Sequence, residues 1–129
     1  MANEIKGTVI LQIDKGNFHK KLPGSTSQFS ATLATSTYVG TSGVFAVPTT
    51  AAGTAFDVSD LTANGGFAYF KNLDATNYVE IGVQVAATFY GLVRLNTGEA
   101  AIFRIADRTN FFARANTAAV SLEYFTIDP

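Results

Sequence analysis

The stretch GGFAYFKNLDATNYVEIGVQV, residues 65–85, contains two apolar runs on either side of a short polar segment. In the second run, apolar residues from Val79 to Val85 alternate with polar or small ones, which is the period of a strand buried on one face. The polar segment, residues 73–77, is then the loop that joins two antiparallel strands. The stretch therefore predicts a corner of a β-sheet.

The same alternation recurs along the chain, whereas apolar spacing at three and four residues, typical of helices, does not. Residues 5–13 predict a first half-buried strand that ends at the turn DKGN, residues 14–17. Further strands are predicted at 28–34, 44–47, 55–58, 67–71, 78–85, 88–95, 100–105, 111–115 and 118–127. About eight to ten short strands predict an all-β protein, an antiparallel β-sandwich that we expect to be jelly-roll-like. Because no linker interrupts the pattern, we expect a single domain over residues 1–129.

The composition narrows the classes of function. The chain has no cysteine, which excludes a disulfide framework, a thiolate zinc site and a cysteine nucleophile. The net charge is −1 and no basic stripe is present, which argues against a nucleic-acid partner. No signal peptide and no apolar run near 20 residues is found, so we expect synthesis in a cytoplasm and no membrane partner. Only 15% of the residues are charged, which suggests a surface covered by other chains.

Polar residues around the quoted loop have structural explanations. We expect Asp74 to accept a hydrogen bond from a backbone N–H two residues on, and Asn77 to adopt the left-handed conformation that closes such a turn. The amide of Asn72 is placed to hold the loop backbone. Gly98, in the turn NTGE that also contains Glu99, is available for a positive φ.

Glu80 is the one carboxylate in this region that alternation places among aromatic and amide side chains. Such a carboxylate can act as an acid or base, but pairing with an arginine on a neighbouring strand is favoured. The candidate arginines, all on strand-like segments, are Arg94, Arg104 and Arg114.

Catalytic and cofactor signals are weak in this sequence. His19 is the only histidine and lies in the lysine-flanked turn GNFHKKLPG, so we expect a surface residue. No spacing singles out a pair of acids, and phosphate-binding glycine patterns are absent. We therefore expect no enzyme activity, no metal and no cofactor.

Aromatic residues give the best residue-level indication of assembly. The pair Phe111–Phe112 must place one ring on each face of its strand, and TFY at residues 88–90 makes the same demand. Aromatic side chains on both faces favour a sheet that is covered on both sides, by a second sheet or by another subunit.

The C-terminal half, residues 65–128, carries motifs of a known group. The segments FKNLDATNYVEIGV, TFYGLVRLNTGEAAIFRIA and FFARANTAAVSLEYFTID resemble small structural proteins encoded by tailed bacteriophages. The resemblance implies a virion protein, with a head decoration or cement protein favoured, that binds the major capsid protein on the outer head lattice and stabilises it. It also implies a homo-oligomer, with a trimer favoured. Carried onto this chain, it places six residues at turn or contact positions: Asn72, Asn77, Glu80, Gly98, Glu99 and Asn116.

Two other functions stay open at this point. One is another virion component, in the tail, neck or fibre. The other is a glycan-binding module built on the same sandwich, which the absence of tryptophan disfavours.

Overall fold

The computed structural model describes residues 4–32, 40–58, 61 and 65–128, and every regular element among them is a β-strand. The chain divides into two compact units, Met1–Ser36 and Thr37–Asp128. The strands are β1 (Glu4–Lys15), β2 (Phe18–Thr32), β3 (Gly40–Val47), β4 (Thr54–Ala55), β5 (Phe67–Asn72), β6 (Val79–Val85), β7 (Thr88–Leu95), β8 (Ala100–Arg104), β9 (Phe111–Ala115) and β10 (Val120–Ile127).

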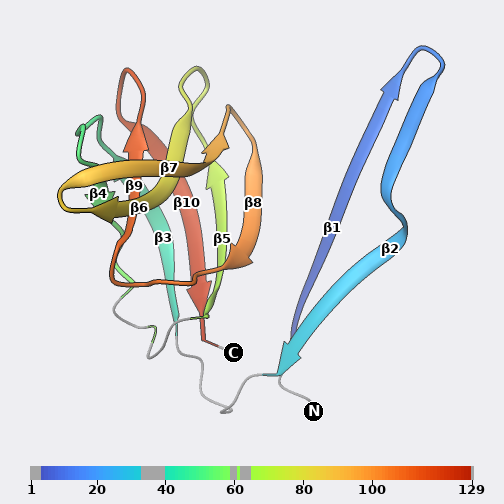
Figure 1. The fold of residues 1–129 in the computed structure, drawn as a ribbon, viewed down its shortest axis with the longest axis horizontal. Coiled ribbons are helices and arrows are strands. Elements are labelled where there is room, and N and C mark those ends of the chain that lie inside the picture. The colour runs from blue at the N-terminus through green and yellow to red at the C-terminus, as the bar shows by residue number, and fades with distance from the viewer. Residues whose placement is uncertain (1–3, 33–39, 59–60, 62–64, 129) are drawn as a thin grey trace. The chain divides into compact units, whose positions relative to one another are not determined.

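The second unit is a sandwich of two antiparallel four-stranded sheets, with strand orders β3-β10-β5-β8 and β4-β9-β6-β7 (Figure 1). Except between β6 and β7, each connection along the chain takes the next strand to the other sheet. Two interleaved four-stranded sheets of this order form a jelly roll. The predicted all-β antiparallel sandwich is therefore confirmed.

The core of the sandwich is largely aromatic at its centre. Phe56 stacks on Phe111 with ring centroids 5.1 Å apart, and Phe70 stacks on Phe103 at 5.6 Å. Offset contacts of this kind stabilise a core beyond the area that the rings bury. Aliphatic side chains that are almost fully buried surround the rings: Val47, Leu61, Val79, Ile81, Ile105, Val120 and Leu122.

The aromatic side chains of Phe111–Phe112 and of residues 88–90 do lie on both faces of their sheet. Other segments of the same chain cover some of them. Phe111 is buried in the core, and Phe112 is half-buried on the outer face of its strand. Phe89 is buried although it lies on that outer face, because the segment before β4 covers it: a Cβ on Gly53 would lie 2.7 Å from the Phe89 ring. Tyr90 is 54% exposed.

The hairpin β6–β7 departs twice from its local pattern. Its register shifts between Ile81 and Gly82, and a Cβ at Gly82 would lie 1.9 Å from the carbonyl oxygen of Tyr90, so only glycine fits there. Its two-residue turn consists of Ala86 and Ala87, with φ of 48° and 63°. Positive φ at both central residues is the pattern of a type I′ turn, which normally requires asparagine or glycine.

Two predictions about burial were wrong. Val85 was expected on the inward face but is 57% exposed, because it is the last residue of β6 before the turn. In the first unit, β1 and β2 pair as a two-stranded antiparallel sheet, and Val9, Leu11 and Ile13 of the predicted half-buried strand are 41–54% exposed. The predicted turn at residues 14–17 is present, with Gly16 at φ 56°.

Other boundaries differ by small amounts. The strand predicted at 28–34 is the end of the longer β2, and residues 33 and 34 lie outside the described residues. The strand predicted at 55–58 is reduced to the two residues of β4. The extent of the domain, predicted as residues 1–129, stays a prediction; the sandwich is formed within the second unit.

Candidate functional site

Most of the polar residues singled out in the sequence meet at one end of the sandwich. Three loops lie there: residues 73–78 between β5 and β6, residues 96–99 between β7 and β8, and residues 116–119 between β9 and β10 (Figure 1). Hydrogen bonds join all three loops, directly or through Asn72 at the end of β5. We call this region the loop end.

Asn72, the last residue of β5, is the centre of the loop end. Its side chain is fully buried, and Nδ2 donates to the carbonyl oxygens of Asn77 at 2.8 Å and Leu95 at 3.0 Å. Its Oδ1 accepts from the backbone N–H of Asp74 at 2.8 Å. Its backbone N–H donates to the carbonyl of Glu99 at 2.9 Å. One buried asparagine therefore satisfies polar groups of two loops and of the end of β7.

Asp74 and Asn77 shape the first of these loops. Oδ1 of Asp74 accepts from the backbone N–H groups of Asn77 at 2.6 Å and Thr76 at 2.8 Å. These two bonds lower the pKa of Asp74 below its ordinary value, because they favour the ionised carboxylate. The side-chain Oδ1 of Asn77 accepts from Thr117 Oγ1 at 2.6 Å, which ties this loop to the one before β10.

The expected left-handed conformation of Asn77 was wrong. Among the described residues, the non-glycine positions with positive φ are Ala86 and Ala87. The loop closes instead through the carboxylate of Asp74, which accepts from the two backbone groups and makes a positive φ at Asn77 unnecessary.

The other predicted residues of the loop end take part in hydrogen bonds with backbone groups. Gly98 has φ 74°, and its N–H donates to the carbonyl of Asn72 at 3.1 Å. Oε2 of Glu99 accepts from the backbone N–H of Asn96 at 2.8 Å. The N–H of Asn116 donates to the carbonyl of Tyr78 at 3.3 Å, and its buried Oδ1 has no hydrogen-bond partner in the described part of the chain. The role of these residues in contacts stays a prediction.

Glu80 is the second residue of β6, next to the loop end, and lies on the solvent side of its sheet. The register places it opposite Arg94 in β7 and Arg114 in β9. Arg114 Nη2 donates to Glu80 Oε2 at 2.6 Å, and the two side chains are 35% and 25% exposed. Arg94 instead stacks on Tyr78, with Cζ 3.5 Å from the ring centre. Glu80 therefore makes the cross-strand ion pair favoured by the sequence.

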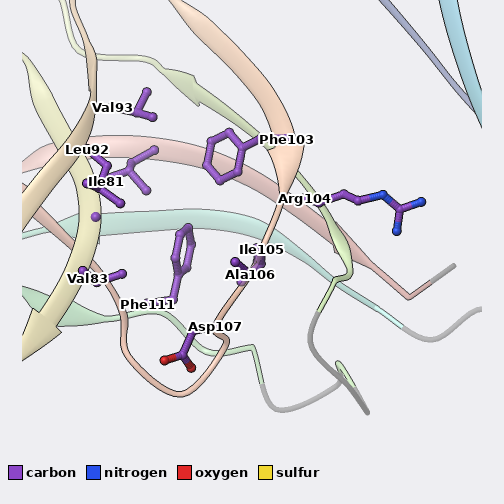
Figure 2. A pocket seen from close by; sticks show the side chains of 11 residues that line it. Ile81, Val83, Leu92, Val93, Phe103, Arg104, Ile105, Ala106, Asp107 and Phe111 are labelled. Carbon is purple, nitrogen blue, oxygen red and sulfur yellow. The ribbon is translucent and has the colours of Figure 1, made fainter.

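An apolar pocket of about 200 Å³ opens between β7 and β8, the edge strands on one side of the sandwich. Figure 2 shows Phe103 and Phe111 facing it from opposite sheets, and the Arg104 side chain pointing away from it. Arg104 stacks on Phe67 at 4.0 Å and donates to the carbonyl of Gly65, so it offers the pocket no charge. The rest of the wall is mainly aliphatic: Ile81, Val83, Leu92, Val93 and Ile105.

A second apolar region lies on the outer face of the sheet β3-β10-β5-β8. Val44 is 63% exposed and Phe125 is 38% exposed. With Tyr69 and Glu123 they line a shallow hollow of about 390 Å³. We call this region the outer face. These strands were predicted from the residue pattern, but that pattern did not indicate which apolar side chains would remain uncovered.

The hairpin β1–β2 contains the single histidine. His19 Nδ1 lies 2.7 Å from Asp14 Oδ1, and both side chains are more than half exposed. Among the described residues, no group of three or more histidine, cysteine or acidic side chains could hold a metal ion. In the same residues no helix is long and apolar enough to cross a membrane.

Comparison of the chain with known protein families, curated proteins and solved structures gave no match.

Proposed function

We propose that this chain is a structural protein of a tailed-phage particle, without enzyme activity. Within the particle, the resemblance of residues 65–128 favours a head decoration or cement protein, made in the host cytoplasm and incorporated into the virion as a homo-oligomer, with a trimer implied. Its partner in this proposal is the major capsid protein, on the outer surface of the head lattice. No metal, cofactor, nucleic acid or membrane takes part.

The observation that carries this proposal is the amount of large apolar side chain left in water. Val44 on the outer face is 63% exposed, Leu92 beside the pocket is 71% exposed, and Phe18 in the hairpin is 58% exposed. Extended apolar surface on a soluble chain marks places where other proteins bind. A protein that binds a capsid lattice and stabilises it needs more than one such surface.

The jelly-roll fold supports the proposal only by analogy. Viral capsid proteins and lectins both use this architecture, and one fold hosts many functions. The virion role is favoured over the glycan-binding role because most of the large apolar side chains that are exposed, such as Val44 and Leu92, are aliphatic. Sugar rings stack on exposed aromatic faces, whereas exposed aliphatic surface is typical of sites where other proteins bind.

For the lattice contact we favour the outer face. It is a shallow hollow that contains exposed Val44 and Phe125, and Glu123 of β10 lies opposite Val44 in its wall. β3 is also an edge strand, so its unpaired backbone groups can add hydrogen bonds to a neighbouring chain. Each bound copy that bridges two capsid subunits stabilises the lattice by its own binding free energy.

The test is binding to purified heads of the cognate phage assembled without this protein. We expect saturable binding to expanded heads, little binding to precursor heads, and a higher temperature of head disruption once the sites are filled. Val44→Lys is expected to weaken binding at least tenfold. Ala118→Lys, which adds the same charge at an exposed position of the loop end, is the matched control.

Three results would contradict the decoration role. Heads that bind no protein at micromolar concentration would exclude it. Labelled antibody on the tail or neck would favour the alternative virion position. Specific binding on a glycan array, together with no affinity for particles, would favour the glycan-binding module.

A further inference from the structure

The distal half of the hairpin β1–β2 has two chemically different faces. The register pairs Leu11 with Leu22, Ile13 with Lys20 and Lys15 with Phe18. Because alternate residues of a strand share a face, these three pairs lie on the same side. We call the four large apolar members of this side the arm face: Leu11, Ile13, Phe18 and Leu22. They are 41–58% exposed.

The opposite side of the same segment is polar and internally bonded. Gln12 pairs with Lys21 and Asp14 with His19. Gln12 Nε2 donates to Asp14 Oδ2 at 2.7 Å, and His19 Nδ1 lies 2.7 Å from Asp14 Oδ1. This side is suited to water, so the arm face is the side that needs a cover.

An uncovered arm face is costly for so long a hairpin. Two-stranded hairpins are at best marginally stable in water, and additional packing against an apolar face is what makes them persist. The arm face also carries Lys15 and Lys20, whose alkyl stems can extend the apolar surface while the ammonium groups reach water at its rim. The face can therefore be buried without burying a charge.

The available area matches what self-association requires. Four large side chains that are about half exposed, together with two lysine stems, offer roughly 500 Å² per hairpin. Two such faces together bury roughly 1,000 Å², which is the lower limit for a specific protein–protein interface. The face can also pack against an identical face, since each of its three cross-strand pairs contains at least one large apolar residue.

We propose that the arm face packs against the arm face of another copy of this chain. The hairpins of neighbouring copies then form a small second core, made of Leu11, Ile13, Phe18 and Leu22 from each copy, with the Asp14–His19 side in water. This inference stands on the hairpin alone and does not depend on the role in a phage particle. It names the surface through which copies of the chain associate.

Cross-linking gives the most direct test, because the chain has no cysteine of its own. In Leu22→Cys the single thiol lies on the arm face, and in the matched variant Lys21→Cys it lies on the polar side next to it. Under the same mild oxidant at micromolar protein, we expect Leu22→Cys to form covalent dimers at least tenfold faster than Lys21→Cys. Equal rates, or slow cross-linking of both, would overturn the proposal.

Measurement of mass in solution is the second arm of the test. The wild-type chain is expected to have the mass of two or more copies, and Leu11→Thr/Leu22→Thr to be monomeric, because threonine keeps the strand propensity but removes the apolar surface. Gln12→Thr/Lys21→Thr, the adjacent pair on the polar side, should remain associated. An unchanged melting temperature of the sandwich in both variants checks that the fold is intact.

The two proposals fail in different ways. A monomeric wild-type chain, or an oligomer that survives Leu11→Thr/Leu22→Thr, overturns the arm contact, the second by placing the association elsewhere. An arm contact that passes both tests in a protein that binds no phage head overturns the proposed function alone.

Discussion

The two long hairpins of this protein, β1–β2 and β6–β7, have similar sequence patterns but differ in how far their apolar residues are buried. β1–β2 has conventional turn chemistry, with Gly16 providing the positive φ, yet its apolar residues are exposed. β6–β7 turns through Ala86 and Ala87, both in a conformation that costs an alanine about 1–2 kcal/mol, yet it buries Val79 and Ile81 of β6 and Phe89 and Leu95 of β7.

The difference lies in what surrounds each pair of strands. β6 pairs with β9 as well as β7, and its inward residues pack against the facing sheet. Gln84 Nε2 donates to the carbonyl of Ala52 and the Gln84 N–H to the carbonyl of Asn110, which fixes β6 close to its turn. Tertiary packing therefore maintains a turn that local preference disfavours, and a favourable turn by itself buries nothing.

The largest expected effect comes from the bulge in β6–β7. Gly82→Ala places a Cβ where the carbonyl oxygen of Tyr90 lies, so the hairpin must open or shift register. We expect a loss of about 3 kcal/mol or more in the free energy of unfolding, measured by urea denaturation. Gly91→Ala is the matched control, because the groups nearest its new Cβ belong to the Glu80 side chain at 3.3 Å or more and can move. Equal losses in both variants would contradict this explanation.

The anchor at the open end of the same hairpin should have the next largest effect. Asn72→Ala removes the side-chain donor to the carbonyls of Asn77, in the loop before β6, and Leu95, at the end of β7. We expect a loss of about 2–3 kcal/mol by urea denaturation. Asn96→Ala, an exposed asparagine in the same group of loops, should cost about 0.5 kcal/mol or less. A small effect at Asn72 would show that the strand pairing alone holds β6–β7.

Removing the strain in the turn should raise stability. Ala87→Gly, alone or with Ala86→Asn, supplies residues that accept positive φ, and we expect a gain of about 1–2 kcal/mol. Ala75→Gly is the control, since Ala75 is exposed in a loop without positive φ and glycine there only adds freedom to the unfolded chain. A melting temperature that falls in Ala87→Gly as it does in the control would argue against strain in this turn.

The smallest effect concerns the loop that leads into β6. The pKa of Asp74 is lowered by the N–H groups of Asn77 and Thr76, so its contribution to stability is present above its unfolded-state pKa, about 3.9. That contribution is lost as the pH falls through the folded-state pKa. Asp74→Asn should therefore be less stable than wild type at pH 7, and the difference should shrink toward pH 3. A difference that is independent of pH would exclude the ionised carboxylate as its cause.

Much of the sandwich could be predicted from the sequence, because period-two alternation is a local property. The strands at residues 88–95 and 111–115 begin and end where alternation places them. The hydrogen-bond acceptor role of Asp74 also follows from its place in a short polar loop. What alternation cannot give is the facing layer, so the exposure of Val9, Leu11 and Ile13 was missed.

Two further features could not be predicted from local sequence patterns, because they depend on long-range strand pairing. The turn at Ala86 and Ala87 has no sequence signal, since it is imposed by strands that are fixed elsewhere. The convergence of Asn72 and Thr117 on one loop depends on strand order, which no local pattern contains. If the pairing of β3 with β10 had been known, alternation along the two strands would have indicated which apolar residues form the outer face.

The hydrogen bonds of Asn72 have a consequence for any partner that approaches the loop end. Loops that are free in solution must be ordered when they bind, and each immobilised side chain or segment lowers the affinity that contacts would otherwise give. Here that ordering has taken place during folding, through one buried amide and the carbonyls it reaches. Association at this end would therefore proceed as contact between preformed surfaces, with little loss of conformational entropy.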